Sequence, residues 1–295
     1  MNDDAAVLHN ASPRPERDVD DKYVNINQLR IHYRDWGAHN DRVVVLLHGL
    51  TSQSHQWDPI AEAIKDQYRV ICPDLRGHGD SDWTPEGYYC PLLAGDLAQL
   101  TDTLRLREFA LVGYSLGARA ALAYAGGHPQ RLTHLVLVDG GPEVSRASAL
   151  SVRNRLQQAA AKRGFRTTNE ALDDLRQRYP NWKPEFHELE VRYELKRNWA
   201  GMFTHKHDPE LYWLTGRASL QDVPYLWEMA HQINVPTLIM RGESSDVLDE
   251  TIVEKMMAAI PDARVITFST GHSIPREDPD RFLAELRTFL RSPAP

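Results

Sequence analysis

A serine flanked by glycines, in Gly113-Tyr114-Ser115-Leu116-Gly117, lies between an apolar run and an alanine-rich stretch. Residues 108–112 predict a short buried strand, and residues 118–125, where alanine and leucine recur, predict the start of a helix. The glycines let strand and helix approach closely, so the turn is tight and the serine hydroxyl projects from it. Without these flanking elements, a glycine-rich turn with an incidental serine would be the better interpretation. The junction therefore constrains the fold to one in which this strand and helix pack together.

Strands and helices alternate along most of the chain. Residues 23–26 and 29–36 predict an N-terminal hairpin, and the continuous apolar run at 43–47 predicts a strand buried on both faces. Because the elements alternate, we expect an α/β fold, with a mostly parallel twisted sheet flanked by helices. Further strands are expected at residues 68–72, 135–138, 237–240 and 265–268, and further helices at residues 57–65, 92–104, 250–259 and 279–290.

Residues 144–229 differ from the rest, because they show helical patterns, many charges and many aromatic side chains but no convincing buried strand. We interpret them as a helical cap inserted between two strands and covering one edge of the sheet. The core then comprises residues 22–143 and 230–295. Residues 1–21 are polar and acidic, and we expect them to form a flexible arm.

Length and composition narrow the class of protein. A chain of 295 residues suits one large domain, or a core with an inserted subdomain. The formal net charge of −7 without a basic stripe argues against nucleic acid as a partner. No apolar run reaches the roughly 18 residues that span a membrane, and the polar start lacks the apolar stretch of a secretory signal. With only Cys72 and Cys90, no disulfide framework is indicated. We expect a cytoplasmic protein that acts on a small molecule, and the sequence leaves a homodimer open.

An activated serine requires a base, an acid that orients the base, and donors for the oxyanion. His272 lies just past the last expected strand, and loops at the carboxyl ends of parallel strands are where open α/β sheets place functional groups. We therefore predict that Ser115 is the nucleophile and His272 the base.

The orienting acid is expected on the loop after the preceding strand, where Asp246 lies, with Glu243 and Asp249 as competitors. Asp139, which ends an earlier strand, is the other serious candidate. We interpret Asp139 as a turn or cap residue that hydrogen-bonds to nearby backbone, and we favour Asp246. Ser115, Asp246 and His272 then occur in the chain order that accompanies a nucleophile on a strand-to-helix turn.

Two backbone amides are candidates for the oxyanion hole. The Leu116 amide follows the nucleophile at a helix N-terminus, where the helix dipole favours negative charge. The Leu50 amide lies in the loop after the strand at 43–47, within His48-Gly49-Leu50. His48 is expected to shape this loop by binding backbone rather than to act as a base.

These residues, in this order and spacing, resemble the α/β-hydrolase superfamily, in particular its capped, esterase-like members. The resemblance covers about residues 22–292 and implies the α/β-hydrolase fold, with Ser115, Asp246 and His272 as the catalytic triad. It also implies that residues 76–79 support the site. The competing interpretation of these residues, an anion or metal site, lacks enough clustered ligands. The matching segments are His48-Gly49, residues 74–81, residues 113–117, Asp246 and Gly271-His272.

The expected activity is that of a serine esterase, a carboxylic ester hydrolase acting on a small, largely apolar substrate without a metal or organic cofactor. Serine at the nucleophile position argues against haloalkane dehalogenases and epoxide hydrolases, which carry aspartate there. Hydrolysis of lactones, amides or carbon–carbon bonds, perhydrolase or cofactor-independent dioxygenase activity, and a catalytically silent receptor remain as alternatives. An aromatic-rich cap suggests an apolar pocket. The candidate substrate-binding side chains are Trp57, Trp83, Tyr114, Trp182, Trp199, Phe203 and Trp213.

Overall fold

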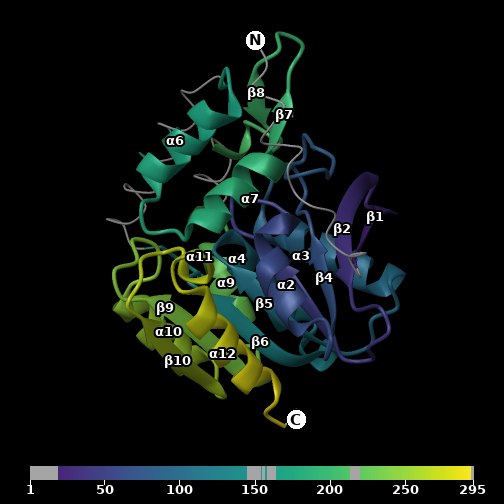
Figure 1. Cartoon of the computed structure of the whole chain (residues 1–295). Helices are drawn as coiled ribbons and strands as arrows, with labels where there is room; N and C mark the ends of the chain where they lie inside the picture. The colour runs from purple at the N-terminus through teal and green to yellow at the C-terminus, as the bar shows by residue number, and fades with distance from the viewer. Residues whose placement is uncertain (1–18, 145–153, 155–156, 158–163, 213–219, 294–295) are drawn as a thin grey trace.

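The computed structural model describes residues 19–144, 154, 157, 164–212 and 220–293 (Figure 1). Eight strands form one sheet in the order β1-β2-β4-β3-β5-β6-β9-β10. The β1–β2 and β2–β4 pairs are antiparallel and the other pairs are parallel, as the alternating pattern predicts. The strands are β1 (Val19–Ile26), β2 (Leu29–Trp36), β3 (Val43–Leu47), β4 (Arg69–Pro73), β5 (Phe109–Tyr114), β6 (Leu132–Val138), β9 (Thr237–Gly242) and β10 (Ala263–Phe268).

The central strands are apolar throughout because both faces of the sheet are covered. In β3, Val45 and Leu47 join one hydrophobic cluster, whereas Val44 and Leu46 join the cluster on the opposite face. All four side chains are fully buried. An unbroken apolar run therefore replaces the alternation typical of a half-exposed strand.

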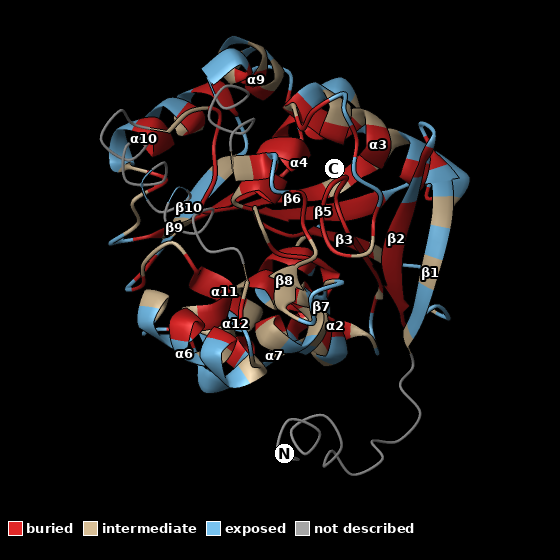
Figure 2. Ribbon diagram, turned by 90° about the horizontal axis from the view of Figure 1, so that it is seen from above, coloured by how far each residue is buried: buried red, intermediate tan, exposed pale blue. Residues whose placement is uncertain are grey.

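Helices cover the two faces of the sheet (Figure 2). One face is covered by α3 (Cys90–Thr103), α4 (Leu116–Gly127), α9 (Val223–Ala230) and α10 (Glu250–Ala259). The other face is covered by α2 (Asp58–Ile64), α11 (Ile274–Glu277) and α12 (Pro279–Leu290). Among the described residues, no helix is long and apolar enough to cross a bilayer.

The inserted segment lies above the carboxyl edge of the sheet (Figure 1). It contains α6 (Thr168–Arg178), α7 (Pro184–Glu194) and a hairpin of β7 (Leu195–Arg197) and β8 (Phe203–His205). The insert contains the helices that the sequence predicts, together with this short hairpin, which follows α7 directly. The cap has a small core of its own, made by Leu175, Trp182 and Phe186.

The predicted boundaries of the cap and of the N-terminal arm both shift. Helix α9 belongs to the core, because Leu226 and Ala230 pack in its main hydrophobic cluster. The core therefore resumes at α9 rather than at residue 230. At the other end, residues 19–21 are part of β1, and the remainder of the predicted arm lies outside the described residues.

Candidate active site

Ser115 occupies a strained turn between β5 and α4. Its backbone φ is 55°, a left-handed value that a non-glycine residue adopts only when its surroundings impose it. A Cβ on Gly113 would lie 2.2 Å from the Gly117 carbonyl oxygen, and a Cβ on Gly117 would lie 2.4 Å from the Leu47 carbonyl oxygen. Both glycines are therefore required for the helix to begin beside the strand, as the pentapeptide predicts. The result is a serine whose hydroxyl projects at the carboxyl edge of the sheet.

His272 lies on the loop after β10 and contacts the serine. Its Nε2 is 3.0 Å from the Ser115 Oγ, and its ring centroid is 5.0 Å from that of Tyr114. The Glu277 carboxylate of α11 accepts hydrogen bonds from the amides of Gly271 (2.8 Å) and Ser273 (3.2 Å). Glu277 thus fixes the backbone on both sides of His272, a role that no motif indicated. The structure brings Ser115 and His272 together as predicted.

The carboxylate that holds the histidine is Asp139, not Asp246. Asp139 Oδ2 lies 2.6 Å from His272 Nδ1, so both ring nitrogens of His272 are engaged, and the structure places Asp139 where the sequence led us to expect Asp246. Asp139 follows β6 with a φ of 45° and is fully buried. Asp246 is half-buried in the loop after β9.

The Asp139 carboxylate is itself held by the loop after β9. The Gly242 amide donates to its Oδ1 (2.9 Å), and the Ser245 hydroxyl donates to its Oδ2. These bonds fix the direction in which Oδ2 faces the imidazole. The loop that was expected to supply the acid instead supplies Ser245 to position it.

The two predicted oxyanion donors lie on the segments that flank Ser115. Leu116 is the first residue of α4, where the opening amides of a helix have no partner within the helix. Leu50 follows Gly49, and a Cβ on Gly49 would lie 3.4 Å from the Ser115 Cβ and 2.8 Å from the Tyr114 ring. The loop after β3 therefore runs directly past the serine.

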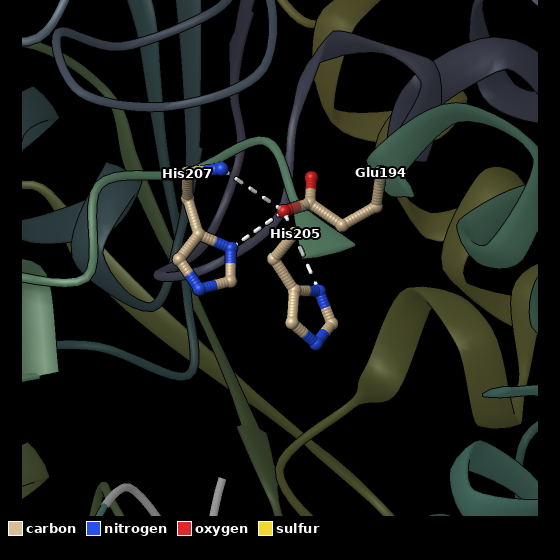
Figure 3. Close-up of side chains that lie close together, drawn as sticks. All are labelled: Glu194, His205 and His207. Atoms are coloured by element: carbon tan, nitrogen blue, oxygen red, sulfur yellow. Dashed lines mark hydrogen bonds and ion pairs between the residues drawn. The ribbon is translucent and has the colours of Figure 1, made fainter. Parts of the chain in front are cut away.

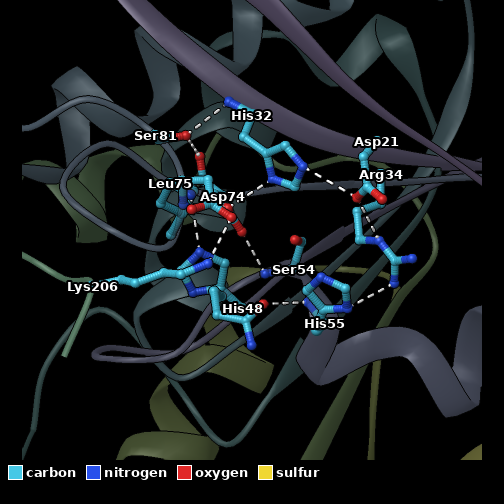
Figure 4. A network of polar contacts seen from close by, with 12 residues as sticks. Asp21, His32, Arg34, His48, Ser54, His55, Asp74, Leu75, Ser81 and Lys206 are labelled. Atoms are coloured by element: carbon cyan, nitrogen blue, oxygen red, sulfur yellow. Dashed lines mark hydrogen bonds and ion pairs between the residues drawn. The ribbon is translucent and has the colours of Figure 1, made fainter. Parts of the chain in front are cut away.

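A buried network supports this loop (Figure 4). His48 is fully buried, its Nδ1 donates to the Gly49 carbonyl (2.8 Å), and the Leu75 amide donates to its Nε2 (2.9 Å). Burial lowers the pKa of His48, which keeps the ring neutral. His48 thus binds backbone as expected, and both its nitrogens are used in doing so.

Asp74, which directly follows β4, is the central acceptor of the same network (Figure 4). Its carboxylate accepts from the amides of Ser54 (2.6 Å) and Asp80 (2.8 Å), and it pairs with His32 Nδ1 at 2.8 Å. His32 also contacts Asp21, at 3.3 Å. The two carboxylates outweigh desolvation and raise the pKa of His32 to about 9, while His32 holds the pKa of Asp74 below its usual range.

This histidine should make stability depend on pH. The pKa of His32 is about 9 in the folded chain and about 6.5 when unfolded. Protonated His32 therefore contributes about 3 kcal/mol below pH ~6.5, and this contribution is lost as the pH rises through 9. We expect His32→Gln to lower the free energy of unfolding most at pH 6 and much less at pH 10. Urea unfolding at both pH values checks this, with the exposed His231→Gln as control, and a difference that grows with pH would contradict it.

Two of the predicted substrate-binding aromatics lie beside the catalytic loop. The Tyr114 hydroxyl is 3.3 Å from Ser273 Oγ. Trp182 lies under the guanidinium of Arg276, which is 4.1 Å from its ring centroid. Arg276 also pairs with Glu190 of α7 at 2.7 Å, so a buried ion pair joins cap and core next to His272. No periodicity or motif in the sequence indicated this pair.

Four of the other candidates lie among the described residues and are not brought together with Ser115. Trp57 is fully buried in the cluster under α2 and α12, which is a core position. Trp83 donates to the Lys206 carbonyl at 3.1 Å, and Trp199 is 98% exposed at the tip of the β7–β8 hairpin. Phe203 pairs within that hairpin, and Trp213 lies outside the described residues. Among the described candidates, only Tyr114 and Trp182 therefore support an apolar pocket beside the catalytic loop.

The segment 76–79 has the supporting role that the resemblance implied. Arg76 is buried and makes a two-pronged ion pair with Asp96, at 2.5 and 2.7 Å. The Gly77 carbonyl accepts from the Asp208 amide at 2.7 Å, which ties the cap to this loop.

Residues 42–279 match the family model for the alpha/beta hydrolase fold, and the chain belongs to this family. It is 28% identical over 268 residues to the putative 2-succinyl-6-hydroxy-2,4-cyclohexadiene-1-carboxylate synthase of Bacillus subtilis (strain 168), covering 90% of this chain and 96% of the relative. It is 29% identical to the 3-hydroxybutyrate-oligomer hydrolase of Cupriavidus necator, over 78% of this chain and 82% of the relative.

Among solved structures, the chain is similar to E-2-(acetamidomethylene)succinate hydrolase, with a TM-score of 0.86 and 25% identity over 93% of this chain and all of that one. The resemblance and the fold class inferred from the sequence are confirmed. The chain is therefore a member of a hydrolase family, and the names of these relatives point to different substrates.

Proposed function

We propose that this chain is a serine hydrolase that cleaves a carboxylic ester of a small molecule through an acyl-enzyme intermediate. The observation that carries the proposal is the continuous contact from Ser115 Oγ through His272 to Asp139, with distances of 3.0 and 2.6 Å. A nucleophile, a base and an orienting acid in contact are the arrangement that activates a serine.

In the proposed reaction, Ser115 Oγ attacks the acyl carbon while His272 Nε2 accepts its proton. Asp139 holds the tautomer with hydrogen on Nδ1 and stabilises the imidazolium that forms. The amides of Leu116 and Leu50 donate to the oxyanion, and each such donor is worth about 3 kcal/mol in comparable enzymes. His272 then protonates the leaving alcohol, and a water molecule completes the second half with the same groups.

The relatives support two candidates for the type of bond that the chain cleaves. The 3-hydroxybutyrate-oligomer hydrolase favours an ester, since hydroxy acids join to one another as esters. The structural similarity to E-2-(acetamidomethylene)succinate hydrolase favours amide cleavage as the second candidate. The expected apolar substrate forms no part of the proposal, because the described part of the chain places only two of the candidate aromatic side chains, Tyr114 and Trp182, beside the catalytic loop. The cytoplasmic location, the homodimer and the lack of nucleic-acid or membrane partners stay predictions from the sequence.

A fluorophosphonate probe tests the proposal directly. We expect one covalent adduct per chain, located on the Ser115 peptide by mass spectrometry, and no adduct in Ser115→Ala. The Ser292→Ala variant, altered near the C-terminus, serves as the matched control and should be labelled fully. Paired p-nitrophenyl esters and p-nitroanilides then separate ester from amide cleavage. A folded chain that takes up no probe and hydrolyses no member of the panel would favour the silent receptor instead.

A further inference from the structure

A second cluster of chemically reactive side chains lies in the cap, apart from the triad (Figure 3). Glu194 ends α7, His205 ends β8, and His207 follows two residues later. One ligand atom from each residue lies within 4.8 Å of the other two. The β7–β8 hairpin brings them together, because it returns the chain to the end of α7.

The three side chains converge on one carboxylate oxygen (Figure 3). Glu194 Oε1 lies 2.5 Å from His207 Nδ1 and 3.8 Å from His205 Nδ1. The other nitrogen of His207, Nε2, lies 2.8 Å from the Tyr212 hydroxyl. Both histidines therefore present Nδ1 to the same point, and Tyr212 holds the His207 ring from behind.

Two of the three side chains are buried, the His205 side chain is 26% exposed, and the cluster is incompletely satisfied. The side chains of Glu194 and His207 are 1% and 2% exposed. Among the described residues, Glu194 Oε2 and His205 Nδ1 have no hydrogen-bond partner. Buried polar atoms are nearly always paired, so an unpaired carboxylate oxygen and an unpaired imidazole nitrogen in one cluster point to a missing group that accepts electron pairs from both.

We propose that Glu194, His205 and His207 bind one divalent transition-metal cation of the Zn²⁺ type. Imidazole nitrogen and carboxylate oxygen suit this class of ion, and two histidines with one glutamate form a known three-ligand set for zinc. With Nδ1 on the metal, His207 Nε2–H donates to the Tyr212 hydroxyl, which fixes the tautomer.

A second group of potential metal ligands serves as a comparison, because its polar atoms already have partners within the protein. His32, Asp74 and Asp80 also lie within 4.8 Å of one another. There, however, Asp74 accepts two backbone amides and the His32 ring, and the Lys206 ammonium lies 2.8 Å from Asp80. A cation already neutralises that cluster, so it carries no metal proposal.

The position of the cap cluster suggests what the ion would do. It would link the end of α7 to the end of the hairpin. The adjoining residues fasten the hairpin to the core, through Lys206 to Asp80 at 2.8 Å and through the Asp208 amide to the Gly77 carbonyl at 2.7 Å. The ion would therefore hold the cap in place over the site. This inference does not depend on the proposed hydrolase activity.

Metal titration of the full chain tests the inference. The protein is prepared without a polyhistidine tag, stripped with a chelator, and titrated with Zn²⁺ by calorimetry and with Co²⁺ by visible absorption. We expect one ion per chain and a Co²⁺ spectrum typical of low coordination number. Glu194→Gln, which is nearly isosteric, should weaken binding at least about 100-fold, and Tyr212→Phe should weaken it about 10- to 100-fold. The exposed His231→Gln is the control and should bind as the parent does.

The outcomes separate the inference from its rivals. Unchanged affinity in Glu194→Gln, with circular dichroism showing the native fold, would overturn it. A loss of binding in His231→Gln equal to that in Glu194→Gln would show adventitious surface binding and would overturn it too. Since the readout is metal affinity, failure here leaves the serine hydrolase proposal untouched, and an inactive triad leaves this one untouched.

Discussion

Ser115→Ala is expected to lower kcat for a p-nitrophenyl ester by roughly 10⁶-fold. Alanine removes the atom that forms the acyl-enzyme and leaves His272 Nε2 without its partner at 3.0 Å. KM should change little, because the amides of Leu50 and Leu116 and the side chains beside the catalytic loop are untouched. Steady-state kinetics across the ester panel measures both parameters, and a burst of p-nitrophenol should disappear with the acyl-enzyme.

The controls for this variant follow from the turn that holds the serine. Alanine at position 115 keeps a Cβ and can adopt the same φ of 55° as serine, so circular dichroism and thermal unfolding should match the parent. Residual activity of about 10³- to 10⁴-fold over the uncatalysed rate is still expected from the oxyanion donors and from substrate binding. Retention of more than a tenth of kcat by the folded variant would rule out Ser115 as the nucleophile.

The core elements were predictable because their patterns are local. The expected helices at residues 250–259 and 279–290 and the strand at 43–47 have the same bounds in the structure. Each is an apolar run or an amphipathic repeat whose burial follows from its own residues. The elbow at Ser115 was predictable for the same reason, since its glycines, strand and helix are contiguous in the sequence.

The identity of the orienting acid was not predictable in this way, because it depends on which residues become neighbours in the folded chain. Strand β6 lies between β5 and β9, so the residues after β6 and after β9 reach the same part of the sheet edge. Asp139 and Asp246 both occupy such positions. The choice between them is made by the φ of 45° at Asp139 and by the donors Gly242 and Ser245. Neither determinant has a sequence signature.

The substrate-binding side chains and their neighbours were predicted least well, because an aromatic residue in the sequence reveals neither whether its side chain is buried nor what it contacts. Trp57 packs in the core and Trp199 is almost fully exposed, whereas the buried pair of Arg276 and Glu190 gave no signal in the sequence. The grouping of the cap histidines with Glu194 was equally unpredictable. His205 and His207 lie ten or more residues from Glu194 in the sequence, and the hairpin brings the three together.

Asp139→Asn is expected to lower kcat by about 10⁴-fold, whereas Asp246→Asn should stay within about tenfold of the parent. The Gly242 amide donates to Asp139 Oδ1 at 2.9 Å, so an asparagine will keep its carbonyl oxygen there. Its NH₂ group then takes the place of Oδ2 and faces His272 Nδ1 as a donor. That ring nitrogen must become an acceptor, which places the proton on Nε2, where it blocks transfer from Ser115.

The paired variants decide between the two aspartates because they make the same chemical change on neighbouring loops. Both are measured for kcat with the same ester, and fluorophosphonate labelling should slow in Asp139→Asn but not in Asp246→Asn. Because the defect is a tautomer and not a lost fold, Asp139→Asn should recover part of its rate at high pH, where hydroxide can substitute for the general base. The opposite ranking of the two variants would return the acid to Asp246 and would mean that the 2.6 Å contact of His272 with Asp139 is only structural.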